Sequence, residues 1–201
     1  DMSNSNVKLD GYPNDYGLTS PFATSGADFI RKDLDYLNIH EAWDISTGSS
    51  AISIGISDAR IKADDGDFVN KISFINPGFY QSLPYDASQP TRYHGTSVAA
   101  IAALQGNNSY GSVGVCQDCE IVGTAFGSYS NLLALADAGV RVINMSWGSV
   151  GSGSQWEQTI VDSLVNHYKI VLVASAGNQV RYQTATDFIH TKQDFYYSTN
   201  L

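Results

Sequence analysis

The stretch that decides the fold reads SAISIGISD and runs from Ser50 to Asp58. Isoleucine occupies every second position from Ile52 to Ile56, and this alternation is typical of a β-strand. Three further apolar runs predict strands at residues 119–126, 140–145 and 170–174. Segments with helical features lie between these runs, and strands that alternate with helices indicate an α/β fold. We therefore predict a parallel sheet flanked by helices on both faces.

The predicted helices differ in how much of their surface should be buried. Residues 94–104 are small and apolar, which suits a helix buried on most sides, and a shorter helix over 131–138 is ended by Gly139. A third helix begins at Ser154, because Ser154 and Glu157 match the capping box that satisfies free N–H groups. Its apolar side chains recur at a spacing of four and form one stripe: Trp156, Ile160, Leu164 and Tyr168.

The remaining segments are polar. Residues 62–93 are rich in Asp, Asn, Pro and Tyr, which predicts loops. Residues 1–40 are also polar and rich in turn formers, so we expect an N-terminal arm laid over a domain that occupies residues 41–201. The start of the chain lacks the basic and then apolar pattern of a signal peptide. No apolar run approaches the roughly 18 residues that span a bilayer.

The composition limits the partners of the chain. Of its 201 residues, 20 are acidic and 11 are basic, so the formal charge is -9 and the isoelectric point is near 4.6. This excess of negative charge argues against nucleic acid or an anionic membrane as the main partner. With 43% hydrophobic and 15% charged residues, the composition is that of a globular domain.

Polar residues stand where the predicted strands end, which is where open parallel sheets bind ligands. Asp58 ends the first strand, Gly148 closes a polar segment after the third, and Asn178 follows the fourth, while His94 opens the buried helix. Taken singly, each residue has an ordinary explanation as a turn, cap or helix-entry residue. Their joint arrangement is much harder to explain in that way.

At these positions the chain resembles the subtilisin-like serine peptidases, over a length that runs from Leu37 to Asn178. The segment HGTSVAA, which begins at His94, resembles the histidine motif of the family, and SIGISD, which ends at Asp58, occupies the place of its aspartate strand. VASAGN, ending at Asn178, resembles the oxyanion segment, and VINMSWG, ending at Gly148, resembles the substrate-binding strand. Four motifs in the order of the family are hard to explain by chance.

The resemblance implies a role for each of these residues. His94 would be the general base that takes a proton from a serine hydroxyl, which is a poor nucleophile by itself. Asp58 would fix the tautomer of the imidazole and stabilise the imidazolium. The side-chain amide of Asn178 would donate to the oxyanion. The extended substrate backbone would pair with Ser146, Trp147 and Gly148.

The nucleophile is missing from this pattern. The family places its serine several dozen residues after the oxyanion asparagine, and only residues 179–201 follow Asn178. Ser97 stands in a GTSVA segment that imitates the surroundings of that serine, but it follows His94 by three residues on one predicted helix. We expect Ser97 to pack beside its own helix. The serine is therefore expected in sequence missing from this chain or on a companion C-terminal chain.

Arg60 is a second departure from the family. The family usually follows its aspartate with a small residue and glycine, whereas this chain has Ala59 and Arg60. The long side chain would either crowd the site or lie along the surface with its charge in solvent.

The two cysteines, Cys116 and Cys119, have the spacing of a redox motif. Thioredoxin-like chemistry would need the pair just ahead of a helix, and one pair supplies only half of a zinc site. Here the pair replaces the turn that precedes a strand in the pattern of the family. We predict a disulfide across this turn in preference to free thiols. It would imply an oxidising, extracellular setting, in keeping with secretion across the family.

A structural calcium ion is the metal that the resemblance implies. The segment LQGNNSYG, from Leu104 to Gly111, resembles the calcium-binding loop of many relatives. Asn108 and Asp67 are the matching ligand positions, and hard oxygen ligands suit calcium. The alternative is a polar loop capped by its own Asn side chains. No cofactor is expected for catalysis. The other histidines show no paired spacing and are predicted to lie on the surface: His40, His167 and His190.

Together these features predict a secreted serine endopeptidase that hydrolyses protein or peptide substrates through an acyl-enzyme. One alternative is a non-catalytic pseudopeptidase or peptide-binding fragment. A second is a nucleotide-binding α/β domain, but no strand is followed by the glycine-rich loop that holds phosphates.

Overall fold

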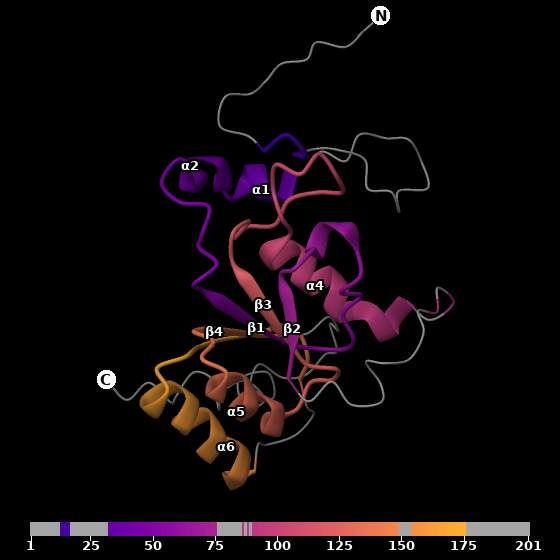
Figure 1. Cartoon of the computed structure of the whole chain (residues 1–201). Helices are drawn as coiled ribbons and strands as arrows, with labels where there is room; N and C mark the ends of the chain where they lie inside the picture. The colour runs from indigo at the N-terminus through magenta and orange to yellow at the C-terminus, as the bar shows by residue number, and fades with distance from the viewer. Residues whose placement is uncertain are drawn as a thin grey trace, which may run out of the picture.

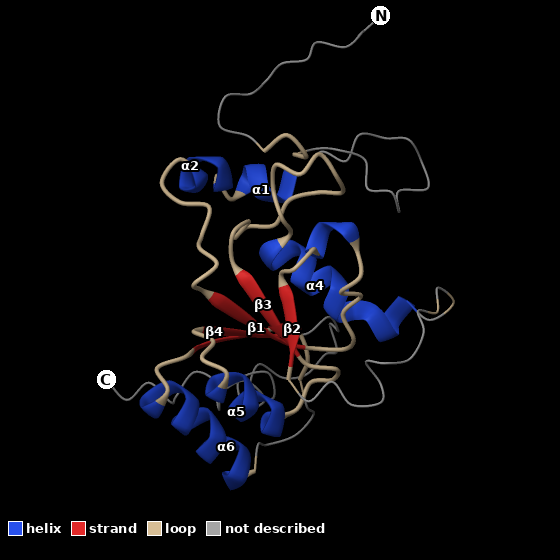
Figure 2. Cartoon of the chain, in the orientation of Figure 1, coloured by secondary structure: helices blue, strands red, loops and turns tan. Residues whose placement is uncertain are grey.

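The computed structural model describes residues 13–16, 32–75, 86, 88, 90–148 and 154–175. Within these ranges five parallel strands form one sheet, in the order β2-β3-β1-β4-β5. The strands are β1 (Ser53–Ser57), β2 (Ile72–Phe74), β3 (Glu120–Gly123), β4 (Val142–Met145) and β5 (Val171–Ala174). Helices cover both faces of the sheet (Figures 1 and 2), so the predicted α/β fold is confirmed.

Strand β1 is the centre of the sheet. It pairs with β3 on one side and with β4 on the other, and Gly55 lies opposite Val122 and Ile143. Ser57, the last residue of β1, lies opposite Met145, the last residue of β4. Because the register is parallel, the residues that follow these two strands leave the sheet at the same edge. The polar segments predicted to form the site begin at this edge.

The helices divide between the two faces, as Figure 1 shows. Helix α4 (His94–Ala103) lies on one face, and α5 (Tyr129–Asp137) and α6 (Gln155–Asp162) lie on the other. Helix α6 continues as a π-helical turn, Ser163–His167. Successive side chains of a strand point to opposite faces. Accordingly Ile54 and Ile56 of β1 pack in the core under α4, while Gly55 faces Leu135 of α5.

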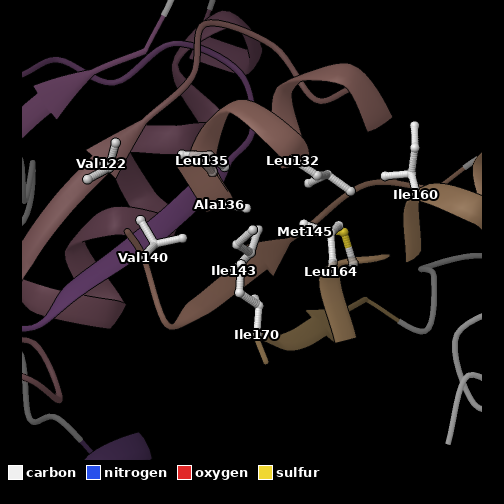
Figure 3. Close-up of a cluster of buried hydrophobic side chains, with 10 residues drawn as sticks. All are labelled: Val122, Leu132, Leu135, Ala136, Val140, Ile143, Met145, Ile160, Leu164 and Ile170. Atoms are coloured by element: carbon white, nitrogen blue, oxygen red, sulfur yellow. The ribbon is translucent and has the colours of Figure 1, made fainter. Parts of the chain in front are cut away.

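Two hydrophobic cores result from this arrangement. The core on the α5 and α6 side (Figure 3) contains Val122, Leu132, Leu135, Ala136, Val140, Ile143, Met145, Ile160, Leu164 and Ile170. The core under α4 contains Ile56, Ile61, Phe68, Ala99, Ala103, Leu104, Cys119 and Ile121. Truncation of one such fully buried Leu or Ile to Ala costs about 2–5 kcal/mol of stability. The small residues of α4 allow the helix to lie close to β1.

The start of helix α6 follows the predicted capping box. The Oγ of Ser154 accepts from the N–H of Glu157 at 3.2 Å, and the carboxylate of Glu157 accepts from the N–H of Ser154 at 2.7 Å. Ile160 and Leu164 are buried, as the apolar stripe predicts. The prediction is wrong for Trp156, which is 57% exposed. Trp156 lies in the first turn of the helix, and its ring makes an edge-to-face contact with Tyr129, with the centroids 6.3 Å apart.

Five described elements were absent from the sequence-based prediction, two of them the 3-10 helices Gly66–Phe68 and Pro90–Tyr93 within the predicted loops. Strand β2 lies within the stretch predicted as loops, and helices α1 (Lys32–Tyr36) and α2 (Ile39–Trp43) lie near the predicted end of the N-terminal arm. The side chain of Trp43 is buried, and its indole N–H donates to the carbonyl of Val115 at 2.8 Å. Helix α2 crosses residue 40, and the domain boundary placed there stays a prediction. His40 is half-buried and His167 is exposed as predicted, while His190 lies outside the described residues.

Candidate active site

Asp58 is the residue that follows β1, and it lies almost fully buried, with 4% of its side chain exposed. Its Oδ1 accepts from the N–H of Ala59 at 2.6 Å and lies 2.9 Å from Nδ1 of His94. Oδ2 is also buried and accepts no hydrogen bond from any residue that the structure describes. Burial next to backbone and imidazole donors keeps this carboxylate in one orientation, directed at the histidine ring.

His94 is the first residue of α4, and 53% of its side chain is exposed. Nδ1 faces the buried carboxylate, so Nε2 lies on the opposite side of the ring. A carboxylate accepts hydrogen bonds, and it therefore favours the tautomer in which Nδ1 carries the hydrogen. In that tautomer Nε2 has a free lone pair and can accept a proton. The predicted contact between Asp58 and His94 is confirmed.

Close backbone packing fixes the start of α4 against the segment after β1. The N–H of Arg60 donates to the carbonyl of Arg92 at 3.1 Å, and the N–H of Lys62 donates to Oγ1 of Thr96 at 2.9 Å. A Cβ at position 95 would collide with the carbonyl oxygen of Ala59, so only glycine fits there. These contacts explain why the histidine is followed by Gly and Thr in the sequence.

The predicted substrate-binding residues leave the sheet beside Asp58. Ser146 follows β4 directly, and its Oγ accepts from the side-chain amide of Asn144 at 2.9 Å. Trp147 is partly buried and donates from Nε1 to Oγ of Ser57 at 3.1 Å, while Gly148 is exposed. The structure thus brings this segment to the same edge of the sheet as the Asp58 and His94 pair.

Three further residues that the sequence analysis discussed are Asn178, Ser97 and Arg60. Asn178 lies outside the described residues, which reach Ser175 at the end of β5; Ser175 donates from its N–H to the carbonyl of Met145 at 3.0 Å. Ser97 is described and is exposed on α4, one turn after His94. Arg60 is buried, with 7% of its surface exposed, so of its two expected placements the one that leaves the charge in solvent is wrong. Its guanidinium lies over the ring of Tyr93.

The two residues predicted to bind calcium lie in contact with each other. The side-chain amide of Asn108 donates to Oδ1 of Asp67 at 2.7 Å, and Oδ2 of Asp67 accepts from the N–H of Ser112 at 2.8 Å. Asp67 is 2% exposed. Burial raises the pKa of this carboxyl, although its hydrogen bonds from Ser112 and Asn108 act in the opposite direction.

Asp15 is a further carboxylate at this loop that the sequence analysis did not identify. It is fully buried; its Oδ2 accepts from the N–H of Asn108 at 3.0 Å, and its Oδ1 has no hydrogen-bond partner in the described structure. Neighbouring Asn14 contacts the same loop through Asn107 and Ser109. Two buried carboxylates, Asp15 and Asp67, thus contact the loop after α4. The described residues contain no cluster of three or more His, Cys, Asp or Glu side chains of the kind that holds a metal.

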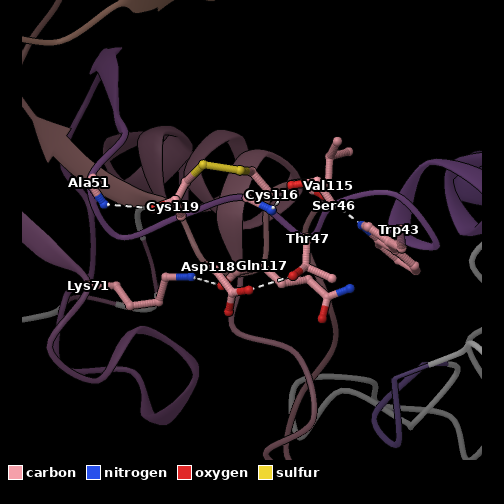
Figure 4. Close-up of a disulfide and its surroundings, with 12 residues drawn as sticks. Trp43, Ser46, Thr47, Ala51, Lys71, Val115, Cys116, Gln117, Asp118 and Cys119 are labelled. Carbon is pink, nitrogen blue, oxygen red and sulfur yellow. Dashed lines mark hydrogen bonds between the residues drawn. A yellow bond between two sulfur atoms is a disulfide. The ribbon is translucent and has the colours of Figure 1, made fainter.

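The predicted disulfide between Cys116 and Cys119 is present (Figure 4), with the Cα atoms 5.4 Å apart. Gly48 lies against the sulfur atoms with a φ of 107°, a conformation that side chains other than glycine adopt only rarely. Within the four-residue loop, the carbonyl of Gln117 accepts from the buried Nζ of Lys71. Asp118 accepts from Oγ1 of Thr47 at 2.5 Å. The disulfide therefore closes the turn that leads into β3.

Known proteases are similar to this chain in sequence. Thermitase of Thermoactinomyces vulgaris is 30% identical over 149 residues, which cover 69% of this chain and 51% of thermitase. An extracellular serine protease of Serratia marcescens is 32% identical over 137 residues, which cover 65% of this chain and 13% of that protein. The chain thus spans about half or less of the length of these relatives.

Solved structures show the same fold at lower sequence identity. The protease domain of PatA matches with a TM-score of 0.55 and 22% identity, over 65% of this chain and 51% of that domain. MycP1 without its N-terminal propeptide matches with a TM-score of 0.54 and 21% identity, over 75% of this chain and 50% of that one. No helix within the described ranges is long and apolar enough to cross a membrane. The sequence profile of the subtilase family matches residues 49–197, most of the chain, and the protein therefore belongs to the subtilase family.

Proposed function

We propose that this chain supplies the aspartate and the histidine of a serine endopeptidase that hydrolyses proteins through an acyl-enzyme. The observation that carries the proposal is the 2.9 Å contact between Oδ1 of Asp58 and Nδ1 of His94 at the carboxyl edge of the sheet. His94 would take the proton of the attacking serine at Nε2 and later give it to the leaving amine. Asp58, which is buried, would hold the ring and stabilise the imidazolium while it exists.

The remaining parts of the mechanism are assigned by position. The segment from Ser146 to Gly148 would pair with the extended backbone of the substrate beside His94. It would thus recognise the main chain of the substrate and not its side chains. The side-chain amide of Asn178 would donate to the oxyanion of the tetrahedral intermediate. The serine would come from a companion chain or from sequence outside these 201 residues. Val171 and Val173 on β5 are 59% and 47% exposed. These exposed apolar side chains support the proposal that further polypeptide packs against this edge strand.

We also propose that Asp67, Asn108 and Asp15 hold a calcium ion. Two buried carboxylates, one with an oxygen that lacks a donor, fit a hard cation better than they fit a neutral loop. The ion would be structural: it would join the segment around Asp15 to the loop after α4 and would take no part in the reaction. A secreted location is in keeping with the disulfide and with the name of the Serratia marcescens relative.

The function is tested by labelling and by turnover. A serine-directed phosphonate should label the purified protein, and intact mass should show the label on a companion chain or on sequence beyond Leu201 and not on Ser97. Asp58→Asn should lower kcat by about 10⁴-fold, because the imidazole then adopts the wrong tautomer. The control is Asp64→Asn, whose side chain is 82% exposed and forms its ion pair with Lys62. A protein that is folded but neither labelled nor active would instead support the non-catalytic peptide-binding alternative.

A further inference from the structure

Arg60 and Tyr93 form a contact that links the two halves of the proposed dyad. The guanidinium carbon of Arg60 lies 4.6 Å from the centroid of the Tyr93 ring, and both residues are 7% exposed. Arg60 is two residues after Asp58, and Tyr93 directly precedes His94. The contact between Arg60 and Tyr93 therefore links the segment after Asp58 to the residue before His94.

The start of α4 depends on the position of Tyr93. Tyr93 is the N-cap residue of the helix, with φ -116° and ψ 23°, and its own side chain makes no cap hydrogen bond. A Ser, Thr, Asp or Asn at this position would fix the first turn by its own hydrogen bond. The side chain of Tyr93 makes no such cap hydrogen bond, so the packing of its ring adds to the backbone contacts of Arg60 and Lys62 in setting the direction of His94. The ring is held on its face by Arg60, and its hydroxyl accepts from the N–H of Asp86 at 3.2 Å.

The buried setting strengthens this contact. A cation over an aromatic face gains more when water is excluded, and both partners are nearly fully buried. The planar guanidinium can also stack on the ring, which an ammonium cannot do. We infer that Arg60 and Tyr93 are positioning residues, which hold the His94 ring at the distance from Asp58 that fixes its tautomer. The inference rests on the proposed function for its kinetic consequence, but the tautomer of His94 can be measured without turnover.

The test uses the purified protein with any chain that accompanies it. Arg60→Met removes the charge and keeps the apolar stem, and Tyr93→Leu removes the ring. The nitrogen-15 shifts of the His94 ring, recorded at alkaline pH where imidazole is neutral, report which nitrogen carries the hydrogen. Each variant should lower the ratio of the Nδ1–H to the Nε2–H form about fivefold. The controls are Arg141→Met and Tyr36→Leu at exposed positions, which should leave the ratio unchanged.

Kinetics provide a second measurement. The kcat of both variants should fall about tenfold while KM changes less than about twofold, because small displacements of a reacting group act on the transition state. The double variant Arg60→Met with Tyr93→Leu should be no worse than either single variant, since each acts through the other. Additive losses would overturn the inference, and so would single variants that match their controls in both tautomer ratio and kcat.

Conservative variants keep the test decisive if a truncated side chain prevents folding. Tyr93→Phe keeps the ring and should retain the wild-type tautomer ratio, whereas Arg60→Lys keeps only a point charge and should lose about threefold. A loss in Tyr93→Phe would assign the effect to the hydroxyl, and a wild-type ratio in Arg60→Lys would remove the need for stacking; either result overturns the inference. If the wild-type protein shows neither turnover nor phosphonate labelling, the proposed function fails, while the nitrogen-15 measurement still decides the positioning role.

Discussion

The indole nitrogen of Trp147 donates a hydrogen bond to Oγ of Ser57 over 3.1 Å. Ser57 is the last residue of β1 and directly precedes Asp58, whereas Trp147 follows β4. The indole ring also meets the ring of Tyr129 edge-on, with the centroids 5.4 Å apart. The proposed substrate-binding segment is thereby attached to the strand that carries the carboxylate on one side and to α5 on the other.

Trp147→Phe should weaken substrate binding more than it slows the chemical step. Phenylalanine keeps an aromatic ring but cannot donate to Ser57, so we expect KM to rise several-fold and the free energy of unfolding to fall by about 1–2 kcal/mol. Urea unfolding and steady-state kinetics measure the two effects. Trp156→Phe, at a 57% exposed tryptophan, should change stability by less than about 0.5 kcal/mol. An unchanged KM in Trp147→Phe would contradict the assigned role of the segment.

Gly95→Ala should damage the site through the backbone. The added Cβ would meet the carbonyl oxygen of Ala59, which must move and displace the residue after Asp58. We expect a loss of about 1–3 kcal/mol in stability, together with a large loss of kcat. Ser97→Ala on the same helix is the matched control, because Ser97 is exposed and should be replaceable at little cost. Loss of phosphonate labelling in Ser97→Ala would show that this serine is the nucleophile after all.

The sequence predicts the sheet and the dyad better than it predicts the residues that support them. The alternation around Ile54 and the aspartate after it specify a strand with a polar end, and a parallel sheet then brings that end to the neighbouring strand ends. Strand β2 could not be predicted, because a run of three residues is too short to show a periodic pattern. The burial of Asp15 could not be predicted, because its position is set by contacts with a loop more than ninety residues later in the chain. The stacking of Arg60 on Tyr93 is a tertiary contact that has no local pattern.

Calcium should stabilise the wild-type protein, and Asp67→Asn should remove most of the effect. A ligand that binds only the folded state at 100 times its Kd adds about 2.7 kcal/mol to the free energy of unfolding. Thermal unfolding in calcium and in excess chelator measures the difference, with Asp64→Asn as a control at an exposed carboxylate. Equal melting temperatures of the wild-type protein in the two conditions would contradict the calcium proposal.

Lys71 should make stability depend on pH in the alkaline range. Burial lowers the pKa of its amine from the ordinary 10.5, although Glu120 and Asp118 partly oppose this. Between the lowered pKa of the folded state and 10.5, the unfolded chain binds more protons, so stability rises with pH through this window. Relative to Lys71→Met, the wild-type protein should therefore gain stability as pH increases there.

Urea unfolding at several alkaline pH values measures this gain. Lys169→Met, at an exposed lysine, is the control and should follow the wild-type curve throughout. A difference in the free energy of unfolding between the wild-type protein and Lys71→Met that stays constant across this pH window would contradict the prediction. It would show that the amine has the same pKa in the folded and the unfolded state.

The central position of β1 has a consequence for how the chain folds. β1 ends at residue 57, but its two partners begin at residues 120 and 142, so neither edge of this isoleucine-rich strand can pair until much of the chain has been made. Pairings of such long sequence separation require the closure of large loops, and they slow folding by comparison with local hairpins. During synthesis the strand emerges before its partners and stays unpaired until they follow, which exposes it to association with other nascent chains. The central place of β1, which brings Asp58 to the site, therefore also lengthens the time for which this strand is open to aggregation during synthesis.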